Sequence, residues 1–176
     1  MLYYCSPYYR SNVYSGANKR FEEFILQTIA LDINFKIIVL DGNIPPIVTS
    51  DKCVLIPSYL AFSRFLLWIW LNFAFIFLEK GVVVNDFKPI PFFAYLKHDA
   101  YLLIHDLRKI IGADGEIRGL IGHILICFLK IFPTVITVSK SSKKLLVDYC
   151  GLLEKDIIVS YNGVSSLYQE SFKHVY

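Results

Sequence analysis

The sequence predicts an α/β protein with a Rossmann-like parallel sheet and helices on both faces. Three observations support this prediction. Short β-branched runs alternate along the chain with segments of helical spacing, an order typical of parallel sheets whose crossovers are helices. Turn-forming pairs such as Asp41-Gly42 and Asn85-Asp86 follow the apolar runs. The 176 residues are about one domain in length, which is enough to bury a core.

The elements of the first half follow from their residue patterns. Residues 2–8 are expected to form the first strand, followed by a polar loop that runs through Gly16. A stripe at positions i, i+3, i+4, i+7 and i+8, counted from Phe21, predicts a helix over 18–33. The run FKIIVL at 35–40 predicts a strand, and residues 52–56 predict another.

The second half continues the same alternation. A helix is expected to begin after Ser139 or Ser141, since either hydroxyl can cap it, and to end at Gly151. The remaining patterns predict strands at 81–84, 101–104, 134–138 and 156–160, and helices at 89–97 and 116–131.

Residues 59–78, YLAFSRFLLWIWLNFAFIFL, are apolar except for Ser63, Arg64 and Asn72. A helix of this length would cross about 30 Å of hydrocarbon. The alternative is a crossover helix that packs on the sheet and touches lipid with its outer side. A membrane span would separate 82–85 from 35–40, so that one sheet could not hold both strands. The alternation therefore favours the crossover helix.

Composition excludes several classes of protein. Apolar residues make up 55% of the chain, aromatic residues 16% and charged residues 19%, which excludes disorder. A net charge of +3 is too small to imply a nucleic-acid partner. The four cysteines show no metal-ligand spacing; they are Cys5, Cys53, Cys127 and Cys150. We expect a reducing compartment, in which each cysteine is a free thiol that acts as a small hydrophobic residue. The first residues carry no pattern of a signal peptide.

Polar residues at the predicted strand ends form a candidate ligand cleft, because parallel α/β sheets bind ligands outside the carboxyl ends of their strands. Purely structural roles remain as alternatives. Gly16 could be a turn glycine, Asp86, Asp106 and Ser139 could cap helices, and His105 could be hydrogen-bonded to a neighbouring loop. Motifs for dinucleotide, P-loop, hydrolase and zincin chemistry do not occur in the sequence. The candidate binding residues are Gly16, Asn18, Asp86, Asp106 and Ser139, with His105 as the candidate catalytic residue.

Three segments resemble family 4 glycosyltransferases of the GT-B fold. The segment ITVSKSSKKLLVDYCGLLEKDIIVSYNGV at 136–164 is similar to the end of that family's N-terminal domain. VVVNDFKPIPFFAYL, from Val82, and LLIHDLR, from Leu102, are similar to two earlier strand ends in the same order. Gly16 resembles one glycine of the family's first glycine loop.

The resemblance implies transfer of a sugar from a nucleotide-sugar donor to an acceptor, without a metal or other cofactor. In this family the N-terminal domain mainly holds the acceptor. By resemblance His105 would approach the transferred sugar, Gly16 would lie near phosphates or acceptor, and Asp86 and Asp106 would line the cleft. Residues 1–164 would form this acceptor-side domain and 165–176 the start of an interdomain link.

The donor-binding half of such an enzyme would lie outside this chain, so that little activity is expected from the chain alone. The expected setting is surface polysaccharide or glycolipid assembly, with the protein cytoplasmic and peripheral on the inner membrane face. Its expected partners are a nucleotide sugar, a glycan or lipid-linked acceptor, the membrane surface and a complementary donor-binding chain. Two alternatives are a non-catalytic acceptor-binding subunit and a small integral membrane protein.

Overall fold

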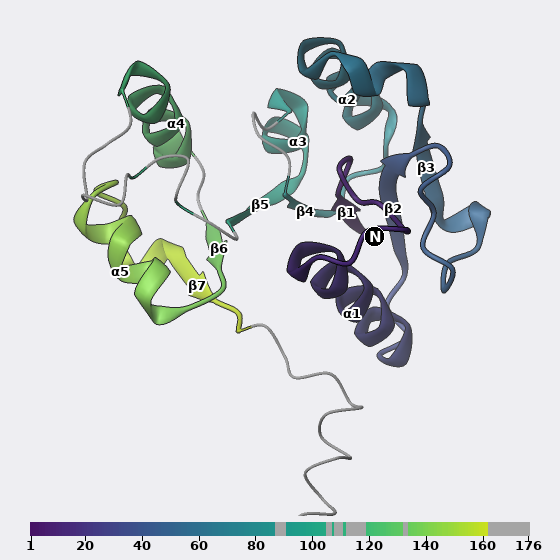
Figure 1. The fold of residues 1–176 in the computed structure, drawn as a ribbon, viewed down its shortest axis with the longest axis horizontal. Helices are drawn as coiled ribbons and strands as arrows, with labels where there is room; N and C mark the ends of the chain where they lie inside the picture. The colour runs from purple at the N-terminus through teal and green to yellow at the C-terminus, as the bar shows by residue number, and fades with distance from the viewer. Residues whose placement is uncertain (87–90, 105–106, 108–110, 112–118, 132–133, 162–176) are drawn as a thin grey trace, which may run out of the picture.

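The computed structural model describes residues 1–86, 91–104, 107, 111, 119–131 and 134–161. Its centre is a seven-stranded sheet in which every neighbouring pair is parallel, in the order β3-β2-β1-β4-β5-β6-β7 (Figure 1). This confirms the predicted fold class. The strands are β1 (Leu2–Cys5), β2 (Phe35–Leu40), β3 (Cys53–Ile56), β4 (Val82–Asn85), β5 (Asp99–Ile104), β6 (Val135–Thr137) and β7 (Ile157–Val159).

The strand order reverses between β1 and β4. From β1 the chain first builds β2 and β3 on one side, and then returns to add β4 to β7 on the other. Cys5 of β1 lies in register with Ile38 of β2 and Asn85 of β4. In open α/β sheets the usual ligand site lies above such a reversal of strand order. We therefore expect a ligand site at the ends of β1 and β4.

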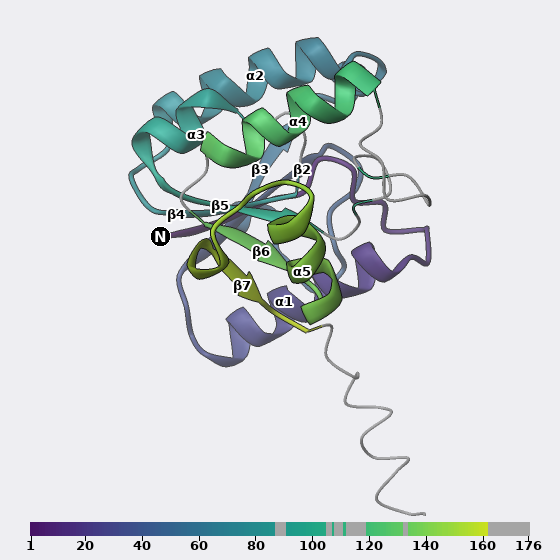
Figure 2. The same ribbon diagram turned by 90° about the vertical axis from the view of Figure 1, so that its left-hand side faces the viewer.

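Helices cover both faces of the sheet. Phe21 and Ile25 of α1 pack with Ile37 and Val39 of β2 on one face. α2 and α3 pack on the other face, beside α4 and α5, and Figure 2 shows α2, α3 and α4 together on the side opposite α1. The helices are α1 (Gly16–Ala30), α2 (Arg64–Phe77), α3 (Phe92–Lys97), α4 (Gly119–Ile131) and α5 (Lys140–Asp148).

The long apolar run is a crossover segment. A 3-10 helix (Ser58–Phe62) comes first, and Ser63 then caps α2 by accepting a hydrogen bond from the Leu66 amide at 3.4 Å. One side of α2 is buried on the sheet, where Phe75 is 0% exposed, whereas Phe77 is 82% exposed. Among the residues that the structure describes, no helix is long and apolar enough to cross a membrane. The strand-like runs on either side of this segment are strands of one sheet.

Several boundaries and burial expectations differ from the prediction. α1 begins at Gly16 rather than 18 because Ser15 accepts a hydrogen bond from the Asn18 amide at 3.1 Å and caps the helix. The first strand ends at Cys5 rather than 8, since the chain turns at Ser6. Cys127, expected to act as a small hydrophobe, is exposed, whereas His98 is 5% exposed.

Candidate functional site

At the carboxyl ends of β1 and β4, a region called here the crevice, a hydroxyl and a carboxylate are in direct contact. Ser6 follows the last residue of β1, and Asp86 follows the last residue of β4. The Ser6 hydroxyl donates a hydrogen bond to Asp86 Oδ2 at 2.6 Å, although the two residues lie 80 positions apart. Because both strands run in the same direction and sit side by side, their ends bring these groups together.

Ser6 and its neighbours at the ends of β1 and β4 are buried. Asn85 is 0% exposed and Ser6 is 4% exposed. Burial raises the pKa of the Tyr4 hydroxyl and that of the Cys5 thiol, and the charge of Asp86 raises both further. The phenol and the thiol therefore stay neutral at physiological pH. The Asp86 carboxylate therefore lies among neutral hydrogen-bonding groups, with the Arg20 guanidinium acting on Tyr4 from α1.

Tyr8 and Arg64 form one side of the crevice. The Arg64 guanidinium lies over the Tyr8 ring, 5.7 Å from its centroid, in a cation–π contact. Burial raises the pKa of Tyr8, while Arg64 lowers it by its charge and a hydrogen bond, and Asp86 raises it. Tyr8 therefore feels both charges, so that a cation from α2 and the carboxylate after β4 act on the same phenol.

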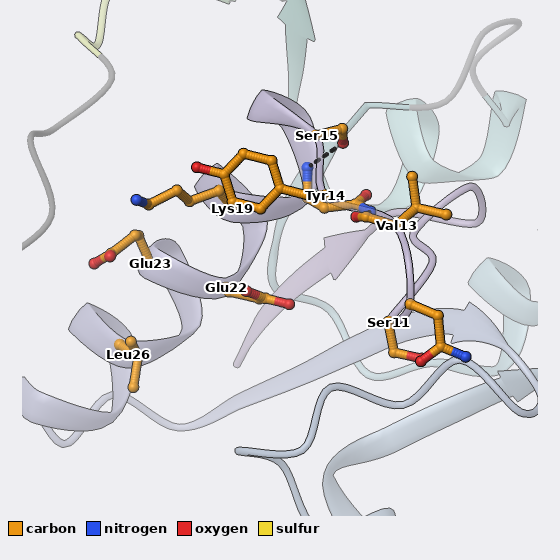
Figure 3. A pocket seen from close by; sticks show the side chains of 10 residues that line it. Ser11, Val13, Tyr14, Ser15, Lys19, Glu22, Glu23 and Leu26 are labelled. Atoms are coloured by element: carbon orange, nitrogen blue, oxygen red, sulfur yellow. Dashed lines mark hydrogen bonds between the residues drawn. The ribbon is translucent and has the colours of Figure 1, made fainter.

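The connection from β1 to α1 supplies a second polar feature. A cavity of about 390 Å³ lies along this loop and the first turns of α1 (Figure 3). Its lining includes Ser15, Asn18, Lys19 and Glu22. Asn18 lines it while its side-chain amide donates to the carbonyls of residues 10 and 13, at 2.8 and 2.7 Å, and so holds the loop in shape.

The N-terminus of α1 is open at Gly16. A Cβ built at this glycine meets nothing within 4 Å, and the backbone has no positive φ. The fold itself therefore does not require glycine at this position. Gly16 and Ala17 are exposed at this end of the helix, whereas the Asn18 amide is taken by the Ser15 cap; helix N-termini attract anions.

The sequence-predicted residues fall into three groups. The structure places Asp86 in the β1–β4 crevice, and Gly16 and Asn18 at the β1–α1 connection. Ser139 caps α5, accepting from the Ser142 amide at 3.0 Å, which is the structural role foreseen as its alternative. His105 and Asp106 lie outside the described residues, as do residues 162–176.

Sequence reasoning missed three residues of the crevice. Ser6 was assigned to the interior of a strand over 2–8, whereas the strand ends one residue before it. Its position directly after the apolar run YYC was the available signal. Tyr8 and Arg64 carried no such signal, because their contact joins a loop to the start of a helix 56 residues later.

The arrangement offers hydrogen-bonding groups to a polar ligand. Asp86 Oδ2 accepts from Ser6, and Asp86 Oδ1 is buried; a carboxylate at a strand end is a group to which ligand hydroxyls can donate. Among the residues that the structure describes, no group of three or more His, Cys, Asp or Glu side chains could hold a metal ion.

Comparison with known proteins leaves the family open. No protein-family model matches the chain, and no curated protein matches it. The structure shows one α/β domain of Rossmann-like architecture, with an all-parallel seven-stranded sheet.

Proposed function

We propose that this domain is the acceptor-side half of a sugar-transferring enzyme that uses a nucleotide-sugar donor. The observation that carries the proposal is the Ser6–Asp86 pair at the point where the strand order reverses. Sugars are recognised mainly through hydroxyl groups, which donate to carboxylates and accept from hydroxyls. The resemblance to family 4 glycosyltransferases supports the same assignment, since its three segments coincide with β4, β5 and the β6–α5–β7 region.

The residues take distinct roles in this proposal. Asp86 accepts a hydrogen bond from an acceptor hydroxyl, and Ser6 holds the carboxylate in place for it. The open N-terminus of α1 at Gly16 stabilises a phosphate of donor or acceptor. By the resemblance, His105 approaches the transferred sugar. A donor-binding domain completes the site; a domain that binds acceptor but never transfers sugar is the competing function.

Ligand binding tests the proposal on the chain itself. Backbone amide NMR spectra are recorded while disaccharides, a glycosyl diphosphate and nucleotide sugars are titrated separately. We expect one of the acceptor-type ligands to shift the amides of Ser6, Gly16 and Asp86. Replacing Asp86→Asn should weaken this binding about tenfold or more, because a hydrogen bond to a charged group is lost.

The matched control is Asp148→Asn, which changes an exposed carboxylate on α5. This variant should bind like the parent, and both variants should keep the parent's melting temperature within a few degrees. Shifts confined to other edges of the sheet, or equal effects of the two substitutions, would contradict the proposal. Binding of acceptor without transfer, once a donor-binding domain is added, would favour the non-catalytic function.

A further inference from the structure

We propose that the outer side of α2, α3 and α4 is a docking surface for an anionic lipid bilayer. This side, called here the outer helical face, faces away from the sheet on the side opposite α1 (Figure 2). It exposes large apolar side chains from three separate parts of the sequence. Those more than half exposed are Phe65, Phe73 and Phe77 of α2, Phe92 and Leu96 of α3, and Leu120 and Ile131 of α4.

The charges around this face identify its partner. α2, α3 and α4 contain no Asp or Glu, and their charged residues are Arg64, Lys130 and Lys97, the last of which donates hydrogen bonds to the Ile76 and Leu78 carbonyls at the end of α2. The adjacent α5 carries Lys140, Lys143 and Lys144 against one acidic residue, Asp148. α1, on the opposite face, instead carries Glu22 and Glu23 among its charges. An apolar surface whose three helices carry basic and no acidic residues complements anionic lipid headgroups, whereas two copies of it would repel each other.

The outer helical face is also hollowed between α2 and α3. A cavity of about 350 Å³ opens there, lined by side chains that include Trp68, Phe73, Ile76 and Phe92. Asn72, the polar residue of this lining, has its amide engaged: it donates to the Trp68 carbonyl at 2.8 Å and accepts from the Phe93 amide at 3.2 Å. A hydrocarbon chain fits such a cavity, because the apolar walls offer it contacts at no cost in hydrogen bonds.

Tryptophan fluorescence tests the docking on the unmodified chain. The protein contains two tryptophans, Trp68 and Trp70, and both lie on α2. Vesicles of phosphatidylcholine with phosphatidylglycerol should shift their emission to the blue, and the same lipids brominated on their acyl chains should quench it. Pure phosphatidylcholine vesicles should have a much smaller effect. Binding that leaves the emission and quenching unchanged would overturn the proposal, since α2 would then lie away from the lipid.

Paired variants assign the surface. Phe73→Gln with Phe77→Gln should lower the partition coefficient into anionic vesicles about tenfold or more, since two exposed aromatic rings no longer enter the lipid. Leu26→Gln with Ile29→Gln, at two 44% exposed positions on α1, is the matched control and should bind like the parent. Circular dichroism verifies that each variant is folded.

Three outcomes would overturn the proposal. The first is no flotation of the parent with anionic vesicles at low salt. The second is an equal loss of binding in the α1 control. The third is a concentration-dependent dimer that Phe73→Gln and Phe77→Gln abolish, which would assign the outer helical face to a second copy. None of these measurements involves a sugar, so their failure leaves the proposed sugar transfer to its own test.

Discussion

The hydrogen bond between Ser6 and Asp86 should contribute measurably to stability as well as to binding. A hydrogen bond to a charged group is worth about 1.5–3 kcal/mol. Ser6 is buried but Asp86 is half-buried, so we expect Ser6→Ala to cost about 1.5 kcal/mol, at the low end of that range. For a domain of this size, that loss lowers the melting temperature by about 3–6 °C.

A double-mutant cycle separates this contact from other effects of the substitutions. The free energy of unfolding is measured in urea for the parent, Ser6→Ala, Asp86→Ala and the double variant. A coupling energy of about 1 kcal/mol is expected, since the two side chains touch. Ser141→Ala, an exposed position on α5, should change stability by less than about 0.5 kcal/mol. Additive losses from Ser6→Ala and Asp86→Ala would refute the contact and the crevice geometry built on it.

Two further predictions concern the amino-terminal side of the sheet. Gly81→Ala should lower the free energy of unfolding by about 1–3 kcal/mol. A Cβ at this position would collide with the Met1 carbonyl and come within 3.1 Å of the Tyr3 ring. Gly16→Ala, with open space around it, should have a free energy of unfolding within about 0.5 kcal/mol of the parent in the same urea titration. Equal losses at both glycines would contradict this assignment. Burial lowers the pKa of His98, whose Nε2 lies 3.1 Å from the Phe75 carbonyl. The unfolded chain therefore binds the proton more readily than the folded chain, and the free energy of unfolding should fall as the pH drops below about 6.5. His98→Gln should remove this part of the pH dependence. A parent-like pH profile of stability in that variant would count against the role of His98.

The fold could be predicted from the sequence because its signals are local and repeated. The run FKIIVL gives β2 with the predicted bounds, and the stripe from Phe21 gives α1 to within three residues at either end. The crossover character of α2 followed from a topological constraint, since β2 and β4 both flank β1. Each of these conclusions needed neighbours along the chain or a single rule of sheet topology, and no knowledge of side-chain contacts.

The crevice was harder to predict because it depends on where strands stop. Placing the end of the first strand three residues late put Ser6 inside the strand and hid its contact with Asp86. The burial of His98 likewise depends on partners that are distant in the sequence. Its ring packs edge-on against Tyr3 and Phe75, with centroids 5.7 and 5.4 Å away, and these partners come from β1 and α2. Long-range contacts of this kind leave no periodic signal in the sequence.

The two proposals meet at the start of α2. Arg64 lies in the first turn of this helix and covers Tyr8 beside the crevice, while Phe65 next to it is 67% exposed on the outer helical face. A bilayer against that face would therefore lie close to the crevice, at the edge of the sheet where β1 and β4 end. An acceptor held in the membrane by a hydrocarbon chain could then place its polar head near Asp86 without leaving the lipid. Arg64 lies beside Tyr8 at the start of α2, where, under the two proposals, its positive charge would favour a phosphate that joins the hydrocarbon chain to the sugar.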